Sequence, residues 1–235
     1  MTGSKSPIWA VVPAAGLGTR MAENAVLGCK ELVEVNGKTM LEHTIFELEK
    51  AGIEQIVVVS SPNKPAIDHA LSGRGVIITH QSEPKGLVDA VECARSVIGG
   101  GVCLVALPDV IFTGVNPSAT LLDEFEGDTL LTVVRVEGEW GAQLNDTGRI
   151  TEIEDLRILG ISDKYPERSF PQGQLRITGR AIWSEDFWAH NDGNEVTTLR
   201  KLALLQKLSA SIVKTEYIDV GNPKGYQYAQ LFFNR

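Results

Sequence analysis

The sequence has few cysteines, no long apolar run and no concentration of basic residues. Its three cysteines, Cys29, Cys93 and Cys103, form no CxxC pair. This excludes a disulfide framework or a cysteine zinc site and favours a reducing compartment, the cytoplasm. No apolar run approaches the ~20 residues that span a membrane. The short apolar segment Ile8–Ala15 contains Pro13 and no cleavage pattern, so we expect neither a signal peptide nor a membrane segment.

The charge balance argues against a nucleic-acid partner. The net charge is -8 and the pI about 5.1, without a cluster of Lys and Arg, whereas surfaces that bind duplexes are basic. The 43% hydrophobic and 22% charged fractions exclude disorder, coiled coil and collagen-like repetition. We therefore expect a folded chain with small-molecule partners, no nucleic acid and no membrane. The sequence leaves open whether the chain forms a homo-oligomer.

The first half alternates apolar strands with segments of helical period. Strands are predicted over Ile8–Val12, Ile56–Val59, Val76–Thr79 and Val102–Leu107, and helices over Met40–Leu48, Pro65–Leu71 and Leu87–Val97. Continuous apolar strands that alternate with helices favour an α/β fold with a doubly wound, mostly parallel, Rossmann-like sheet. The carboxyl ends of such strands meet at one edge, where ligands bind.

The second half is punctuated by glycine and proline and indicates a small mixed β extension of the same sheet. The pattern predicts a turn at Asn145–Gly148, strands over Leu175–Trp183 and Ile212–Ile218, a helix over Val196–Leu208, and a terminal helix capped by Asn222–Pro223. We expect a single domain over 1–235, with a nucleotide-binding half, 7–136, and an acceptor-binding half, 137–235. Trp183, Phe187 and Trp188 are expected to form a packing cluster.

A glycine-rich loop, Pro13–Met21, follows the first predicted strand. Gly16 and Gly18 let backbone N–H groups approach an anion, and Thr19 and Arg20 add a hydroxyl and a guanidinium. It is not a Walker loop, because no Gly-Lys-Ser/Thr follows, nor a full dinucleotide fingerprint, because a methionine occupies the third glycine position. By itself the loop could equally be an ordinary tight turn.

Lys30, ten positions after Arg20 in Cys29-Lys30-Glu31-Leu32-Val33, makes the pattern more specific. The loop and this lysine together resemble the signature of the sugar-1-phosphate nucleotidyltransferases, and most of all the bacterial UDP-glucose pyrophosphorylase group, although that group usually has proline where Cys29 stands. The resemblance implies a glycosyltransferase-A-type sheet. It also implies roles for the loop: Arg20 binds the β- and γ-phosphates, Lys30 sits near the α-phosphate, and the nucleotide contacts Ala14, Ala15, Gly16, Gly18 and Thr19.

Three further segments resemble the same family. Gln81–Leu87 resembles the base-recognition segment, which implies that Gln81 and Gly86 contact the base. Leu107–Ile111 and Asp219–Tyr226 resemble the two metal-aspartate motifs, which implies that Asp109 and Asp219 hold Mg²⁺, Asp109 being catalytic as well. Each segment alone could be a loop or a capping residue, but the four matches lie in the family's order across almost the whole chain.

The acceptor motif departs from the family. A Glu-Lys-Pro motif normally holds the sugar phosphate, whereas this chain has Asp155 as the acid and Leu156 in place of the lysine. By resemblance the acceptor site includes Gly141, Asp155 and Gly179. Another cation is expected to replace the lysine, the candidates being Arg149, Arg157, Arg168 and Arg176.

The resemblance implies an enzyme of NDP-sugar biosynthesis that joins an NTP to a sugar 1-phosphate with Mg²⁺ and releases pyrophosphate. Gln81 and Gly86 favour UTP or dTTP, because an amide can pair with the edge of uracil or thymine. Two alternatives stay open. One is a cytidylyltransferase for a non-sugar phosphate or phosphonate acceptor. The other, suggested by Leu156, is a non-catalytic nucleotide-binding regulator.

Overall fold

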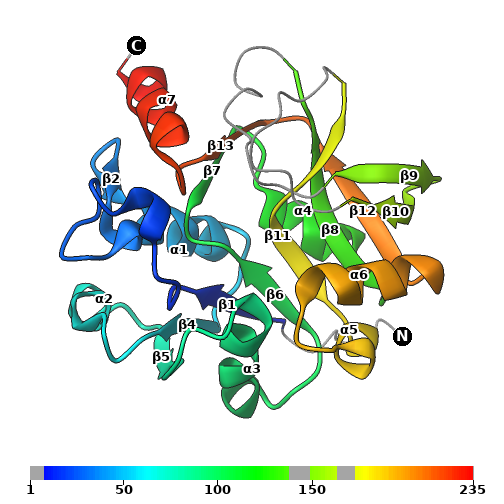
Figure 1. Cartoon of the computed structure of the whole chain (residues 1–235), viewed down its shortest axis with the longest axis horizontal. Coiled ribbons are helices and arrows are strands. Elements are labelled where there is room, and N and C mark those ends of the chain that lie inside the picture. The colour runs from blue at the N-terminus through cyan, green and yellow to red at the C-terminus, as the bar shows by residue number, and fades with distance from the viewer. Residues whose placement is uncertain (1–7, 138–148, 163–172, 235) are drawn as a thin grey trace.

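A nine-stranded sheet forms the centre of the protein in the computed structural model, which describes residues 8–137, 149–162 and 173–234. Its strands are β1 (Trp9–Pro13), β4 (Ile56–Ser60), β5 (Ile77–His80), β6 (Cys103–Ala106), β8 (Thr129–Arg135), β9 (Ile150–Glu154), β10 (Arg157–Ile161), β11 (Leu175–Trp183) and β12 (Leu208–Val213). They lie in the order β5-β4-β1-β6-β11-β8-β12-β10-β9 (Figure 1). The sheet therefore joins strands from both halves of the chain.

The strand directions confirm the predicted sheet. β1 pairs in parallel with β4 and β6, and β4 with β5. β11 runs antiparallel to both β6 and β8, and the hairpin β9–β10 extends the sheet beyond β12. Two short antiparallel ribbons complete the β structure, β2 (Glu34–Val35) with β3 (Lys38–Thr39), and β7 (Val110–Thr113) with β13 (Glu216–Asp219).

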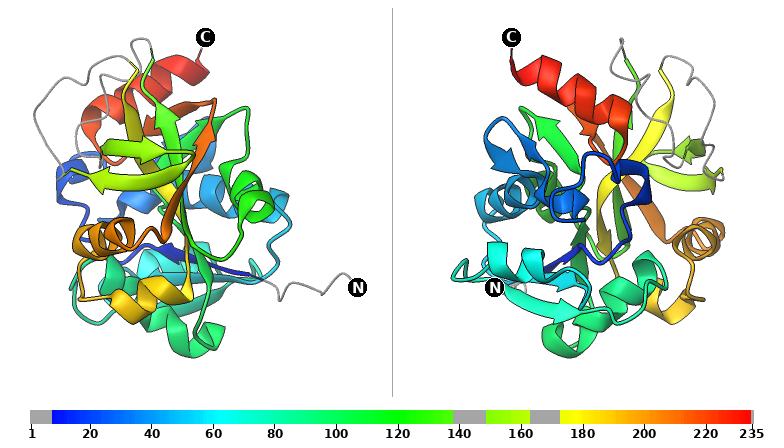
Figure 2. Two further views of the ribbon diagram at one scale, coloured as in Figure 1. Left: turned by 90° about the vertical axis from the view of Figure 1, so that its right-hand side faces the viewer. Right: turned by 60° about the vertical axis from the view of Figure 1, so that its left-hand side comes forward.

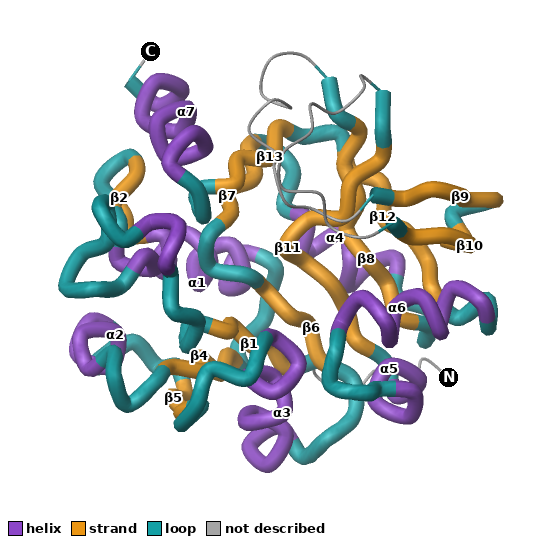
Figure 3. Tube along the Cα trace, in the orientation of Figure 1, coloured by secondary structure: helices purple, strands orange, loops and turns teal. Residues whose placement is uncertain are grey.

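Helices cover both faces of the sheet (Figures 2 and 3). One face carries α1 (Met40–Lys50), α2 (Pro65–Ala70) and α4 (Pro117–Glu124), and the other carries α3 (Leu87–Ile98), α5 (Glu185–His190) and α6 (Glu195–Leu204). Successive side chains of β1 point to opposite faces of the sheet. Ala10 and Val12 lie on the face covered by α1, α2 and α4, and Val11 lies on the face covered by α3, α5 and α6. This two-sided burial explains the uninterrupted apolar strands.

Nearby residues determine where helix α1, the first helix predicted from the sequence, begins and which of its faces is buried. Thr39 caps α1, and its side chain and that of Glu42 form a reciprocal capping box. Met40, Leu41, Ile45 and Leu48 are all buried on one face. The terminal helix α7 (Pro223–Phe233) begins as predicted, with the Asn222 side chain accepting from the Gly225 N–H.

Two predicted boundaries in the second half are wrong. Helix α6 ends at Leu204 and not at Leu208, because the backbone turns at Gln206, whose φ is 56°, and Leu208 begins β12. The single strand predicted over Ile212–Ile218 is two strands, since the chain leaves the main sheet after Val213 and enters the ribbon with β7. This change of sheet carries Asp219 toward Asp109.

The aromatic cluster and the cysteines can also be compared with the predictions from the sequence. Trp183 stacks on Phe187 with ring centroids 3.9 Å apart, and Trp188 packs edge-on against both, which confirms the packing cluster. The three cysteines are free. None of the helices in the described ranges is long and apolar enough to cross a membrane. The turn predicted at Asn145–Gly148 lies outside the described residues.

Candidate active site

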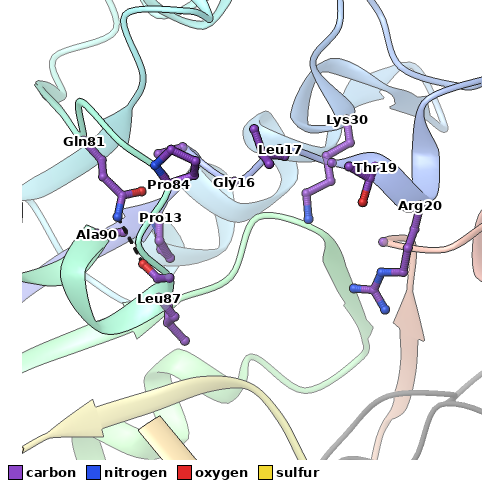
Figure 4. Close-up of a pocket in the computed structure, with 14 residues that line it drawn as sticks. Pro13, Gly16, Leu17, Thr19, Arg20, Lys30, Gln81, Pro84, Leu87 and Ala90 are labelled. Atoms are coloured by element: carbon purple, nitrogen blue, oxygen red, sulfur yellow. Dashed lines mark hydrogen bonds between the residues drawn. The ribbon is translucent and has the colours of Figure 1, made fainter. Parts of the chain in front are cut away.

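A cavity of about 380 Å³ opens beside the carboxyl ends of β1 and β5 (Figure 4). Eight of the residues singled out in the sequence line it: Ala15, Gly16, Gly18, Thr19, Arg20, Lys30, Gln81 and Gly86. Ala14, near the start of the loop, does not line the cavity: it is fully buried, and its N–H donates to the Val59 carbonyl. The fold therefore brings residues as far apart in the sequence as Pro13 and Gly221 into one site at the expected edge of the sheet.

The glycine loop and Lys30 pack closely together. Gly18 has a left-handed backbone with φ 64°, and it begins the short 3₁₀ turn Thr19–Met21. A Cβ at Gly18 would stand 3.3 Å from Cγ of Lys30, so the glycine makes room for the lysine stem. In Figure 4 the side chains of Lys30, Thr19 and Arg20 lie together at the end of the site away from Gln81. The site thus presents two cations and backbone N–H groups suited to a polyphosphate.

Lys30 forms an ion pair with Asp109, with Nζ 2.5 Å from Oδ2. Asp109 stands between β6 and β7, at the carboxyl end of a central strand. Burial acts to raise the pKa of Asp109, but the charge and hydrogen bond of Lys30 hold it below its ordinary value. Burial acts to lower the pKa of Lys30, but Asp109 keeps it above its ordinary value. Both groups are therefore charged at neutral pH.

Asp219 and Asp109 face each other across Gly221. A Cβ at Gly221 would stand 2.7 Å from Oδ2 of Asp109 and 3.0 Å from Oδ1 of Asp219. The Gly221 N–H donates to Asp219 Oδ1 at 2.9 Å, and the Val220 N–H donates to the Asp109 carbonyl at 2.8 Å. Only glycine fits between the two carboxylates, and the ribbon β7–β13 holds them together.

The two carboxylates suit a divalent cation. Burial, and then the charge of Asp109, raises the pKa of Asp219 to about 6. A cation between them would relieve this repulsion. No group of three His, Cys, Asp or Glu side chains in the described part of the chain suits a metal. Mg²⁺ needs only one or two carboxylates when phosphate oxygens and water complete its shell, so Asp109 and Asp219 fit Mg²⁺ bound with a nucleotide.

The raised pKa of Asp219 predicts a pH-dependent stability of the metal-free protein. The folded value of about 6 lies above the unfolded value of about 3.9, so the folded state binds the proton more tightly. Stability should fall by about 2–3 kcal/mol as pH rises through this interval. Thermal unfolding in EDTA should give a higher Tm at about pH 5 than at about pH 7.

Asp219→Asn should flatten this pH dependence and raise the Tm near neutral pH, because the amide carries no buried charge. Added Mg²⁺ should raise the Tm of the wild type at neutral pH. An unchanged difference between the two pH values in Asp219→Asn would show that Asp219 is not the responsible group.

Gln81 and Gly86 form the opposite end of the cavity, before α3. The Gln81 N–H donates to the Ser60 carbonyl at 2.9 Å, which ties the segment to the end of β4. Gly86 has φ 102° and ψ -178°, a conformation open only to glycine, and it begins α3. The amide side chain and the glycine therefore meet at the place where the resemblance puts the base.

Lys64 is a site residue that the sequence analysis missed. The residue is only 6% exposed, and its ammonium donates to the Ala14 carbonyl at 2.9 Å and the Gly16 carbonyl at 2.5 Å. It also pairs with the buried carboxylate of Glu31 at 2.9 Å. Lys64 therefore joins the glycine loop to the segment that carries Lys30. Most lysines are exposed, and no pattern in the neighbouring residues indicates that this one is buried.

Lys64→Met is expected to destabilise the protein by about 3–5 kcal/mol, because it leaves the Glu31 carboxylate buried without its partner. Chemical denaturation measures the loss. Lys85→Met is the matched control, since Lys85 forms an exposed pair with Glu83 and its loss should leave stability unchanged. Equal stability of Lys64→Met and wild type would mean that the contacts of Lys64 with Glu31 and the glycine loop do not stabilise the fold.

The acceptor residues are not gathered as the resemblance implied. Gly179 does lie near the metal aspartates: its carbonyl accepts from the Leu107 N–H at 2.8 Å, and a Cβ there would meet Leu107 at 3.0 Å. Asp155 and Leu156 instead form the turn of the β9–β10 hairpin, with φ of 44° and 66°, and line a separate cavity with Arg157. The structure thus leaves Asp155 outside the nucleotide cavity. Gly141 and Arg168 lie outside the described residues.

Comparison with known proteins gives concordant matches. A model of the MobA-like NTP transferase domain matches residues 10–181. The UTP–glucose-1-phosphate uridylyltransferases of Klebsiella pneumoniae and Bacillus subtilis are each 26% identical, over 94% and 95% of this chain and 90% of each relative. The UTP-bound UGPase from Acinetobacter baumannii has a TM-score of 0.75 at 24% identity, covering 96% of this chain and 93% of that one. A UDP-glucose pyrophosphorylase complexed with UDP-glucose has a TM-score of 0.77 at 20% identity, covering 97% and 98%.

Proposed function

Since this chain belongs to the MobA-like NTP transferase domain family, we propose that it joins an NTP to a sugar 1-phosphate and releases pyrophosphate. The observation that carries the proposal is the cavity that unites the glycine loop, Lys30 and Gly221, with the two facing aspartates beside Gly221. The relatives act on UTP and glucose 1-phosphate by name, which supports the same reaction class here. The reaction consumes an NTP, and we place it in the cytoplasm, the compartment that the cysteine content favours.

The reaction needs charge neutralisation more than proton transfer. A phosphate oxygen of the sugar 1-phosphate attacks the α-phosphorus of the NTP, a new P–O bond forms, and the P–O bond to pyrophosphate breaks. The attacking phosphate monoester is already anionic at neutral pH, so no general base is required. The protein must hold two anions together and stabilise the transition state. Arg20 and the glycine loop serve this purpose at the β- and γ-phosphates.

Lys30 is placed to serve two partners. In the structure its ammonium neutralises Asp109. Asp109 and Asp219 would hold Mg²⁺, which would supply positive charge at the phosphate oxygens. Lys30 also lines the cavity of the glycine loop, where its ammonium can donate to the α-phosphate oxygens of a bound NTP. The same lysine therefore stabilises the metal-free site and, in the reaction, the transition state.

The base end of the cavity supports UTP or dTTP as the donor. Gln81 is 3% exposed and lines the cavity together with Pro84 and Gly86. An amide pairs with a pyrimidine edge, and we expect the larger purine to fit less well against the loop at Gly86. A buried amide discriminates strongly, because a mismatched base leaves it unpaired. The cytidylyltransferase alternative requires CTP to be the best donor.

We assign the acceptor phosphate to Arg149 and Arg176. The two residues form a β-bridge, and Arg176 is fully buried in β11. Burial and then the charges of Asp219 and Asp109 raise the pKa of Tyr217, while the charges of Arg180 and Arg176 lower it, so Arg176 and the two aspartates all lie in the neighbourhood of Tyr217. Arg157 instead binds Asp128 in the separate hairpin cavity.

Arg149→Met should raise the KM for sugar 1-phosphate by roughly tenfold or more, because the phosphate loses a charge-assisted hydrogen bond. The KM for the NTP should not change. Arg157→Met is the matched control and should leave both values unaltered. The assignment is wrong if steady-state kinetics show the acceptor effect in Arg157→Met and none in Arg149→Met.

A screen of ATP, GTP, CTP, UTP and dTTP against a panel of sugar 1-phosphates, read by pyrophosphate release, tests the proposed function. We expect release that depends on the acceptor and is fastest with UTP or dTTP. Nucleotide binding without release for any pair would favour the regulator. Release with CTP and a non-sugar phosphate alone would favour the cytidylyltransferase.

A further inference from the structure

The carboxamide of Gln81 is fixed by two acceptors. Its Nε2 donates to Asp89 Oδ2 at 2.6 Å and to the Gly86 carbonyl at 3.1 Å, the second bond being the dashed line in Figure 4. Asp89 lies in the first turn of α3, which begins after Gly86. Both partners act as acceptors, since one is a carboxylate oxygen and the other a backbone carbonyl. Therefore the amide nitrogen must face them, and the amide oxygen must be the atom left for a ligand.

This orientation makes Gln81 an acceptor toward the base. Uracil and thymine carry an N–H at N3, whereas N3 of cytosine is an acceptor and its neighbour at C4 is an amino group. An amide oxygen can accept from the N3–H of uracil, but it faces a lone pair on N3 of cytosine. An amide free to turn over could offer its nitrogen to cytosine instead. The two bases are thus distinguished only if something prevents the amide from turning.

We propose that Asp89 is a positioning residue that selects uracil or thymine over cytosine by holding the Gln81 amide in one orientation. The inference rests on the proposed function for the placement of the base, and it adds a residue that the resemblance did not assign. Gly86 reinforces the same orientation from the backbone. The deep burial of Gln81 makes the choice strict, because water cannot satisfy a mismatched amide.

A purely structural role of Asp89 predicts a different effect of its removal on UTP and CTP binding. An acid in the first turn of a helix stabilises it through the helix dipole. Loss of that effect would lower the stability and would weaken UTP and CTP binding equally. Selection by Asp89 instead changes the ratio of the two affinities.

The test measures Kd for UTP and CTP by calorimetry with Mg²⁺, and kcat/KM for both with the best acceptor. Asp89→Ala should reduce the UTP preference at least about tenfold, since the shorter of the two hydrogen bonds is lost and only the Gly86 carbonyl then opposes the turned amide. Asp89→Asn should keep most of the preference, because its amide oxygen still accepts from Gln81. Glu92→Ala, an exposed change on the same helix, is the matched control and should not alter the ratio.

Should Asp89→Ala fail to fold, Asp89→Ser serves instead, since it keeps a polar group in the first turn but is too short to hold the amide. An unchanged UTP-to-CTP ratio in a folded Ala or Ser variant overturns the inference, even if turnover with UTP upholds the proposed function. A reduced binding ratio in a protein without any turnover upholds the inference and contradicts the proposed function.

Discussion

Asp109→Asn and Asp219→Asn should each lower turnover by roughly 10²-fold or more while the protein stays folded. The two carboxylates face each other around Gly221, and each would supply half of the protein's ligands to Mg²⁺. An amide keeps the size of the side chain but removes the charge. Metal binding then weakens, and the charge of the transition state is left uncompensated.

Initial rates over a range of Mg²⁺ concentrations measure this loss, with thermal unfolding as the check on folding. Asp123→Asn, an exposed change on α4, is the matched control and should keep the wild-type rate. Near wild-type turnover of either variant at saturating Mg²⁺ would exclude that aspartate as a ligand.

Lys30→Ala is expected to lower kcat by roughly 10²-fold while the Kd for the NTP changes little. The ammonium gains most where negative charge develops, at the α-phosphate, so its contribution is larger in the transition state than in the bound nucleotide. In the metal-free protein the variant should also raise the pKa of Asp109, because burial then acts without the opposing lysine.

Single-turnover kinetics and calorimetry separate the two effects. Lys50→Ala is the control, since Lys50 lies at the exposed end of α1 and contacts Phe46. If Lys30→Ala weakens nucleotide binding and leaves kcat intact, Lys30 binds the ground state and has no particular role in the transition state.

Much of the nucleotide half could be predicted because its signals are local. The apolar strands and the capping box of α1 are set by neighbouring residues, and the structure reproduces them within a residue or two. The position of the site follows from the rule for parallel strands, which places the carboxyl ends of β1, β5 and β6 at one edge. The family resemblance, carried by Arg20, Lys30 and the aspartate motifs, was confirmed by the family match.

The rest depends on contacts between distant segments. Lys64 is buried because the glycine loop and Glu31 surround it in the fold. No local sequence pattern indicates this burial. Asp89 looks like an ordinary acid at a helix start until the fold sets it against Gln81. The change of sheet after Val213 was missed because both strands are apolar and only a short turn separates them.

The most direct test of the central claim is ³¹P NMR of the purified protein with Mg²⁺, UTP and the best acceptor of the screen. The account predicts that the α- and β-phosphorus signals of a nucleotide sugar and the signal of free pyrophosphate grow together in equal amounts. They should grow only when the sugar 1-phosphate is present. Release of UDP and inorganic phosphate, or of pyrophosphate without any nucleotide sugar, would contradict the claim.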